Sequence, residues 1–370
     1  LEIGLAATEV IESGATTGKA GLLEDTPRFD YSGGATCPSL LLEPSRVNNI
    51  AYSESITSSW WQLSNVTTLD NQGISPEGLN NAGKITLTST GGCVIYRTSV
   101  TIGDGVLSFF AKPETLSTGS RVRVSVDGVG AAYWNINGTL NAVTGGTAEN
   151  GENYGNGWFR FSYNVPSGSV ANYGVQGGAI GDTMLVYGMQ AEPNATYATS
   201  YIPNHSGGTI TRGADDCGGA GDAATFNDSE GVLYAEIAAL SDDGTNRSLT
   251  ISDGTTNNII QILFSSVSNS IRFIIRVGGV GGNNLDKLTT SYTVTNFNKL
   301  ALKWEQNNAQ VWINGNQLGT PDTNSDVPTG LNNLSFEYLT VGNNLFGKAK
   351  QVLVFPTALS DSDLATLTTL

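Results

Sequence analysis

The sequence has few of the side chains that most enzyme and metal sites require. Its 370 residues include one histidine, three cysteines and two methionines. A serine–histidine or cysteine–histidine catalytic site would have to use His205, which we expect to be a solvated loop residue between two domains. Zinc sites normally need several histidine or cysteine ligands. These shortages predict a protein with no catalytic residues and no metal site of this kind.

Charge is also scarce and is mostly of one sign. Charged residues make up 14% of the chain, against about 25% in an average soluble protein. The 33 acidic and 18 basic residues give a formal net charge of −15. No basic stripe is available to neutralise phosphates, and the longest apolar runs, such as Leu40–Leu42, are far too short to cross a bilayer. We therefore expect no nucleic-acid partner and no membrane insertion.

The three cysteines, Cys37, Cys93 and Cys217, cannot all pair with one another. Their spacing fits no zinc or redox motif. Two arrangements remain: three unpaired thiols in a protein assembled in a reducing cytoplasm, or a Cys37–Cys217 disulfide that brackets the first domain.

The features that are abundant are those of β-structure. Glycine accounts for 46 of the 370 residues, and apolar residues alternate with polar ones in segments such as 121–126 and 300–304. Asn314-Gly315 predicts a type I′ hairpin turn. One short helix is expected near the end, capped by Ser360 and Asp363. The pattern predicts an all-β chain of two tandem antiparallel β-sandwich (jelly-roll) domains with a short N-terminal connecting segment.

Changes in composition divide the chain into three parts. Residues 1–36 show little alternation and are expected to be a connector or the end of a shaft. Residues 37–216 and 217–370 are expected to be the two sandwiches, separated by the glycine-rich stretch before Asp222. We expect the second sandwich to fold by itself when it starts at about Asp222.

Six segments of the first block form a recognisable series. They are, in order, Pro27–Tyr31, Leu40–Arg46, Asn156–Ser162, Met189–Glu192, Tyr197–Pro203 and Thr211–Asp215. With these segments the first block resembles a jelly-roll domain that is common in phage and prophage tail proteins. One departure from that family is Val47-Asn-Asn49, where Thr-Asn-Leu is usual.

Four segments of the second block form another recognisable series: Phe226–Glu236, Phe297–Trp304, Gln310–Gly315 and Phe355–Leu364. With these segments the second block resembles the laminin-G or concanavalin-A-like jelly roll found in phage fibres and extracellular bacterial proteins. The two resemblances together imply a non-enzymatic subunit of a virion fibre or appendage, a receptor-binding adhesin that recognises glycans on the host surface. Such a subunit would be assembled in the host bacterial cytoplasm and would sit on the exterior of the virion.

The resemblances also imply partners. These are other copies of the chain in a homotrimer, other virion proteins through the N-terminal segment, and polysaccharide on the host surface. The low charge and the glycine-, threonine- and asparagine-rich surface suit close packing of subunits. Two alternatives stay open: a structural decoration or connector of the virion, and a carbohydrate-active enzyme or its accessory binding module.

Candidate ligand-binding residues fall into two groups. Trp60-Trp61 and Tyr133-Trp134 are adjacent aromatic pairs on expected strands, so one member of each should point outward and could stack on a sugar; Trp61, Tyr133 and Trp134 are the candidates. The alternative is that both pairs fill cores and interfaces. In the second domain, the turn containing Asp242, Asp243 and Asn246, and the turn 278–284, carry polar residues with no evident structural role. We expect the second domain to carry most of the host binding.

Paired carboxylates could in principle form a glycosidase site. The pairs Asp215/Asp216, Asp242/Asp243 and Asp361/Asp363 lie in expected linkers, turns or a helix cap, where aspartate is favoured for local hydrogen bonding. No cofactor is expected, although laminin-G-like folds can hold calcium at a rim.

Overall fold

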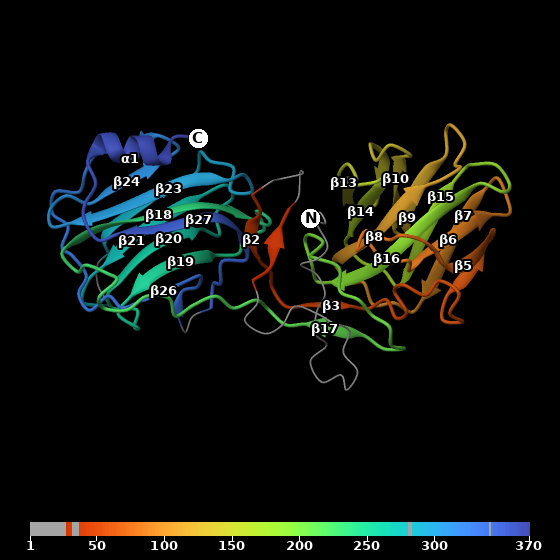
Figure 1. Cartoon of the computed structure of the whole chain (residues 1–370), viewed down its shortest axis with the longest axis horizontal. Coiled ribbons are helices and arrows are strands. Elements are labelled where there is room, and N and C mark those ends of the chain that lie inside the picture. Colours follow the sequence, from red (N-terminus) through yellow and green to blue (C-terminus); the bar gives the residue numbers. More distant parts are fainter. Residues whose placement is uncertain (1–26, 32–36, 280–282, 340–341) are drawn as a thin grey trace. The chain divides into compact units, whose positions relative to one another are not determined.

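The computed structural model describes residues 27–31, 37–279, 283–339 and 342–370. Two compact units are present: unit 1 is built on Ser45–Gly213, and unit 2 combines Pro38–Pro44 with Ala214–Leu370 (Figure 1). Most of the predicted connector, residues 1–36, lies outside the described residues. No helix in the described segments has the length and apolar character needed to cross a membrane.

Two antiparallel sheets form unit 1. One has the strand order β11–β10–β9–β15–β7–β4, and the other has the order β12–β14–β8–β16–β6–β5, with β13 beside β14. A separate two-stranded ribbon pairs β3 with β17. The strands up to β17 that lie outside unit 2 are β1 (Phe29–Asp30), β3 (Arg46–Asn48), β4 (Gln62–Ser64), β5 (Val66–Gly73), β6 (Ala82–Leu87), β7 (Gly92–Thr98), β8 (Gly105–Pro113), β9 (Arg121–Val126), β10 (Gly130–Asn135), β11 (Leu140–Thr144), β12 (Thr147–Ala148), β13 (Glu152–Gly155), β14 (Trp158–Val165), β15 (Val170–Gln176), β16 (Thr183–Pro193) and β17 (Ile210–Arg212).

Alternation along the strands builds the core of unit 1. On β9, Val122, Val124 and Val126 are buried, as the sequence predicts. They join Trp134 and Phe161 in one apolar cluster that draws on strands of both sheets. Removing this apolar surface from water at about 25 cal/mol per Å² is the main stabilising contribution to a sandwich of this kind.

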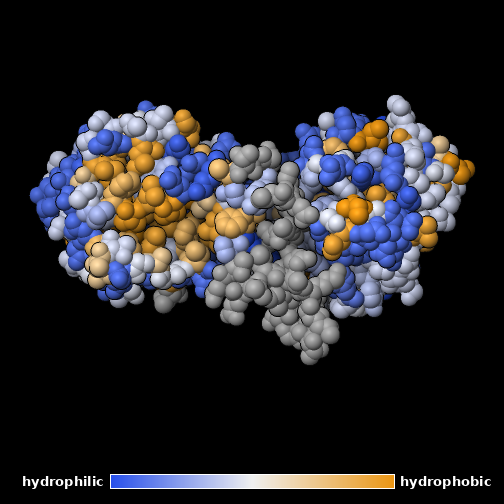
Figure 2. Space-filling model, in the orientation of Figure 1, coloured by the Kyte–Doolittle hydropathy of each residue, from blue (hydrophilic) through white to orange (hydrophobic). Residues whose placement is uncertain are grey.

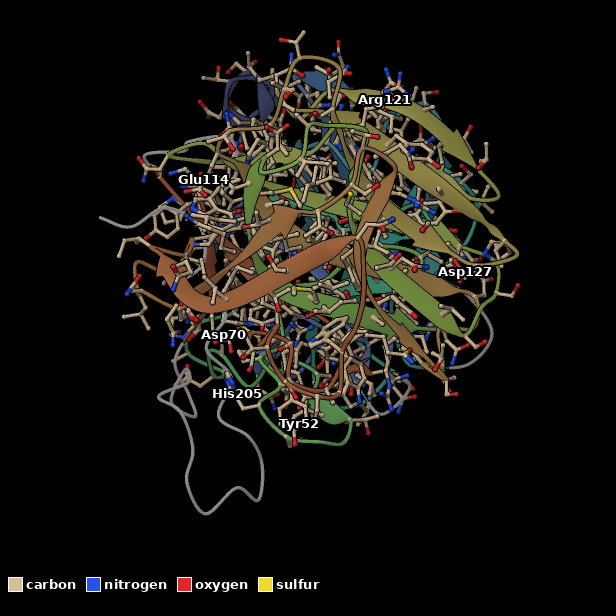
Figure 3. The ribbon with its side chains drawn as sticks, turned by 90° about the vertical axis from the view of Figure 1, so that its right-hand side faces the viewer. Tyr52, Asp70, Glu114, Arg121, Asp127 and His205 are labelled. Atoms are coloured by element: carbon tan, nitrogen blue, oxygen red, sulfur yellow. The ribbon has the colours of Figure 1, made fainter. Side chains whose placement is uncertain are left out.

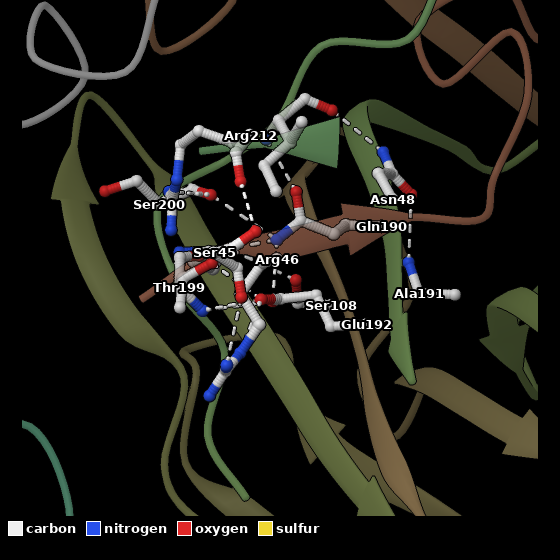
Figure 4. Close-up of polar contacts among 12 residues, drawn as sticks. Ser45, Arg46, Asn48, Ser108, Gln190, Ala191, Glu192, Thr199, Ser200 and Arg212 are labelled. Atoms are coloured by element: carbon white, nitrogen blue, oxygen red, sulfur yellow. Dashed lines mark hydrogen bonds and ion pairs between the residues drawn. The ribbon is translucent and has the colours of Figure 1, made fainter. Parts of the chain in front are cut away.

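A buried polar network covers the outer face of the β8–β14–β16 sheet (Figure 4). The Glu192 carboxylate on β16 is fully buried and accepts hydrogen bonds from Gln190 Nε2 at 2.7 Å, Thr199 N at 3.0 Å and Thr199 Oγ1 at 2.6 Å. Burial raises the pKa of Glu192, while the Thr199 hydroxyl and the charges of Arg160 and Arg212 act in the opposite direction. The network ties the segment around Thr199 to the sheet.

The arginines of this network explain a difference from the predicted pattern. The alternation on residues 158–165 predicts that Arg160 lies on the face opposite the core, in solvent. It does lie on that face, but it is 8% exposed, and its Nη2 donates to Thr199 O at 2.6 Å and Ser108 Oγ at 3.1 Å. The segments that carry the resemblance of the first block include Arg46, Glu192, Thr199 and Arg212. These residues belong to the buried polar network and so stabilise the fold.

Two further antiparallel sheets form unit 2. One contains the order β2–β27–β18–β23–β24–β25, and the other has the order β22–β21–β20–β19–β26. Apolar residues from both enclose a second core around Trp304 and Phe273. The elements are β2 (Ser39–Leu42), β18 (Glu230–Ala239), β19 (Arg247–Ser252), β20 (Ile259–Phe264), β21 (Ile271–Arg276), β22 (Asn283–Thr289), β23 (Asn298–Glu305), β24 (Gln310–Ile313), β25 (Asn316–Gln317), β26 (Asn333–Ser335), β27 (Gly347–Phe355) and α1 (Asp361–Thr368).

The predicted boundary at residue 37 is wrong by one strand. Strand β2 was expected to open the first sandwich, but it pairs with β27 of unit 2 in the register Leu40↔Ala349 and Leu42↔Gly347. Leu41 and Leu42 are buried there. The apolar residues 40–42 pair with the edge of β27, a strand far along the chain. Local sequence patterns carry no information about such a pairing.

Residues 45–213 are thus an insertion between the first and second strands of unit 2. The two chain segments that leave unit 2 run side by side: Glu43 N donates to Asp215 Oδ2 at 2.6 Å, and Asp215 N donates to Glu43 O at 2.9 Å. Unit 2 therefore holds both ends of the insertion together.

The short elements of unit 2 match the prediction. Ser360 caps α1 by accepting a hydrogen bond from Asp363 N, and Leu364 is buried. Asn314 and Gly315 have φ values of 48° and 84°, as a type I′ turn requires.

Hydrophobic side chains gather on the visible face of unit 2, in the region of β18 and β27 (Figure 2). All three cysteines are unpaired, so the Cys37–Cys217 disulfide does not form in this structure.

Candidate functional site

Unit 1 carries an open pocket of about 230 Å³ where four chain segments meet. The segments are the stretch after β3, the turn before β4, the end of β7 with the residues that follow it, and the loop before β17. The flanking residues Tyr52 and His205 lie at the lower edge of the unit in Figure 3. The ten lining residues are Asn49, Ala51, Trp60, Arg97, Ser99, Val100, Thr101, Gly207, Gly208 and Thr209.

An indole and a guanidinium form one side of the pocket. The Arg97 Cζ lies 4.9 Å from the centroid of the Trp60 ring, and Arg97 Nη1 donates to Trp60 O at 2.6 Å. Trp60 in turn meets Trp61 edge-on, with ring centroids 4.8 Å apart. The buried Trp61 thus supports Trp60, and Trp60 supports Arg97.

Hydroxyl groups line the other side. The side chains of Ser99, Thr101 and Thr209 are exposed and form no hydrogen bond with another described residue. Asn49 Nδ2 donates to Thr101 O at 2.6 Å and so holds this side together. The pocket therefore offers free hydroxyls beside an aromatic surface and one cation.

The loop before β17 is built around Asn204. Its Nδ2 donates to Gly208 O at 2.8 Å, and its Oδ1 accepts from Ser206 N at 3.1 Å. Tyr52 N donates to Ser206 O at 3.2 Å. These bonds fix the pocket wall in place before any ligand arrives.

Backbone strain is concentrated next to the pocket. Of the eleven non-glycine residues with positive φ in the described chain, eight are asparagine, which tolerates this conformation. Two of the other three are Tyr52 (φ 51°) and Ser99 (φ 62°). Such conformations cost about 1–3 kcal/mol each and are concentrated at ligand sites. Ser99 lines the pocket and Tyr52 follows Ala51, which also lines it, so the strained backbone supports this pocket as the candidate site.

The aromatic candidates are only partly supported. Trp61 and Trp134 are 5% and 0% exposed and belong to the core of unit 1, so they cannot stack on a sugar. Trp60 and Trp61 lie in the turn before β4, so the expectation that this pair lies on a strand is wrong. Tyr133 and Trp134 lie on β10, where adjacent residues point to opposite faces, and Trp134 takes the inner face. Tyr133 is half-buried on the outer face, with the Arg123 guanidinium 6.0 Å from its ring centroid, and lies outside the pocket.

The candidate residues of unit 2 hold its own turns together. Asp242 accepts from the Asn269 backbone N–H at 3.0 Å, Asp243 accepts from Arg247 Nη2 at 2.8 Å, and Asn246 Oδ1 accepts from Ser266 N at 2.7 Å. The expectation that these residues lack a structural role is wrong. Part of the turn 278–284 lies outside the described residues.

A cluster of buried acids and phenols lies elsewhere in unit 1. Tyr187 and Tyr201 both contact Glu54 Oε1 at 3.2 Å, and Tyr187 also bonds to Glu77. Burial is the main cause that raises the pKa of each tyrosine. His205 Nε2 lies 3.5 Å from Glu54 Oε1. Both phenols are about 1% exposed, so the oxygens of this cluster satisfy one another in the interior.

The acidic pairs named from the sequence sit where local bonding explains them. Asp361 and Asp363 lie in the first turn of α1, and Asp215 bonds to Glu43. Among the described residues, no three His, Cys, Asp or Glu side chains are grouped closely enough to hold a metal ion.

No protein-family model and no curated protein matches the chain. The solved structures similar to it are β-sandwich proteins. One is the CBM40 domain of a Ruminococcus gnavus IT-sialidase bound to α2,3-sialyllactose: 17% identity, 42% of this chain and 94% of that chain covered, TM-score 0.34. Another is the laminin α1 LG4–5 domains of mouse: 10% identity, 94% and 96% covered, TM-score 0.27. At these identities the likeness extends to the fold alone, and neither structure assigns a role to any residue here.

Proposed function

We propose that this chain is a non-enzymatic glycan-binding protein and that its sugar site is the pocket formed by Trp60 and Arg97. The observation that carries the proposal is the combination, in one open pocket, of an indole, a guanidinium and three unbonded hydroxyls. Sugars present both apolar ring faces and many hydroxyls, so a few well-placed polar groups beside an aromatic side chain suit them. The site lies in unit 1, whereas the sequence favoured unit 2.

A large side chain at Gly208, which lines the pocket, should weaken binding without disturbing the fold. A side chain at Gly208 would project into open space, because a Cβ added there meets no atom within 4 Å. Gly208→Leu is therefore expected to reduce glycan binding by at least about tenfold, while the free energy of unfolding changes by no more than about 0.5 kcal/mol. Binding of the full chain and the variant to an array of bacterial and host glycans provides the measurement.

The matched control is Gly213→Leu. A Cβ at Gly213 also meets nothing within 4 Å, but this residue does not line the pocket. The control is expected to bind like the unmodified chain. No binding to any glycan would favour the alternative of a purely structural protein. Release of reducing sugar that stops when an acidic residue is replaced would favour an enzyme.

We further propose that the protein is a subunit of a virion fibre or appendage. The support is the resemblance of residues 27–216 and 226–364 to the two jelly-roll types found in phage fibres. Mass spectrometry of particles purified after prophage induction, from a strain that carries the gene, tests this. We expect the chain in particles at a few copies each; its absence from them would rule out this location.

Self-association is expected to give a homotrimer. The chain carries few charged residues, and apolar side chains gather on the visible face of unit 2 (Figure 2). Light scattering of the full chain at micromolar concentration should give three times the 38.7 kDa of one chain. A mass of one chain under these conditions would contradict the prediction.

A further inference from the structure

We propose that the Trp60–Arg97 pocket selects a sugar that carries a single carboxylate, such as a hexuronic acid or a sialic acid. This inference rests on the proposed function and gives its site a substrate class. Three features of the pocket support it: the sign of its charge, the amount of that charge, and the way the guanidinium is held.

The pocket differs in charge from the rest of the molecule. The whole chain has 33 acidic and 18 basic residues. Among the ten residues that line the pocket there is one cation, Arg97, and no aspartate or glutamate. A single guanidinium balances one carboxylate, whereas a phosphate monoester carries about 1.5–2 negative charges at neutral pH and would remain under-neutralised. The charge of the pocket therefore favours a carboxylate.

Arg97 is held ready to bind an anion. Strand β7 positions its backbone, which pairs with Ala171 of β15. The guanidinium stacks on Trp60, and its Nη1 is bonded to Trp60 O. No other hydrogen bond is formed by this guanidinium in the described structure. The edge made by Nε and Nη2 is thus available for a two-point contact with a carboxylate, and little side-chain freedom is lost when that contact forms.

The free hydroxyls complete the selection of a sugar over a simple organic acid. Ser99, Thr101 and Thr209 can each donate one hydrogen bond and accept others. They lie in the same pocket as Arg97, so one ring can present its carboxylate to the cation and its hydroxyls to these side chains. Trp60 acts here as a positioning residue, because its indole and carbonyl fix the guanidinium.

The test compares each acidic sugar with its own neutral form. Calorimetry on the full chain would use sialyllactose and a glucuronic-acid oligosaccharide, each beside the product in which the carboxyl is reduced to an alcohol. Mannose 6-phosphate serves as the phosphate probe. We expect the acidic forms to bind at least about tenfold more tightly than the reduced forms, as charge-assisted hydrogen bonds predict. Mannose 6-phosphate should bind no better than the reduced sugars.

Variants assign this preference to the guanidinium. Arg97→Gln should remove the tenfold difference, and Arg97→Lys, which keeps the charge but not the two-point contact, should retain only part of it. Arg121→Gln is the matched control: Arg121 is an exposed arginine at the far end of unit 1 from Tyr52 (Figure 3) and should leave the preference intact. Thermal unfolding of each variant shows that the fold is kept.

Each other outcome overturns the inference in a recognisable way. If acidic and reduced sugars bind equally and Gly208→Leu abolishes both, the glycan site stands but the carboxylate preference is wrong. A stronger response to mannose 6-phosphate, or a preference that survives Arg97→Gln, also overturns it. Absence of binding to every sugar would remove the proposed function itself.

Discussion

Replacing Glu192 with leucine is expected to lower the free energy of unfolding of unit 1 by about 3–5 kcal/mol. The change removes a buried carboxylate whose charge interacts with those of Arg160 and Arg212, which are 8% and 4% exposed. It also removes the acceptor of the Thr199 backbone N–H and hydroxyl. Hydrogen exchange of the full chain in increasing urea, read by mass spectrometry, should show the loss in peptides from β8, β14 and β16.

Two comparisons make this result specific. Glu192→Gln keeps the size of the side chain and one acceptor oxygen for Thr199, so a smaller loss is expected. Peptides from unit 2 act as an internal control, because the core of unit 2 is separate from this network. Equal losses for the leucine and glutamine variants would contradict this expectation and would show that the lost charge, which both variants share, governs this position.

The second large effect concerns strand β2. A fragment that begins at residue 214 lacks the strand that pairs with β27, and with it the buried Leu41 and Leu42. Full burial of one leucine contributes about 1.5–3 kcal/mol, so we expect the fragment to be less stable by about 3 kcal/mol or more. It should also associate through the exposed edge of β27. The expectation of independent folding from about Asp222 omits this strand.

A chain from which residues 45–213 are removed should recover the lost stability. Glu43 and Asp215 are bonded to each other, so a short glycine-rich linker can join Pro44 to Ala214. Thermal unfolding of this chain, of the fragment, and of a control with Leu41→Asn and Leu42→Asn compares the three directly. If the fragment and the joined chain unfold at the same temperature, β2 is dispensable.

Sequence patterns predicted these elements of the fold because each element depends on residues that are close to it in the sequence. The valines of β9, the Asn314-Gly315 turn and the Ser360 cap each follow from residues a few positions apart. The placement of β2 depends instead on pairing with a strand about three hundred residues away, which no local pattern encodes. Burial of Arg160 likewise depends on a distant segment that covers its face of the sheet.

The site was harder to predict for a similar reason. Alternation predicted that one of Trp60 and Trp61 points outward from a strand, but both residues lie in the turn before β4, where strand alternation does not apply. Arg97 was overlooked, although a single basic residue at the end of an apolar strand in an acidic chain was a usable signal. The pocket joins four segments between residues 49 and 209, and only the tertiary structure brings them together.

The insertion of unit 1 determines which parts of the chain bear a mechanical force. A pull applied between Pro38, where unit 2 begins, and a point after β27 reaches the antiparallel pair of β2 and β27 first. Both ends of the insertion are held at the Glu43–Asp215 bonds, so the pull bypasses unit 1 until β2 separates from β27. A sugar bound at the Trp60–Arg97 pocket would therefore remain in an undistorted site while unit 2 is under tension.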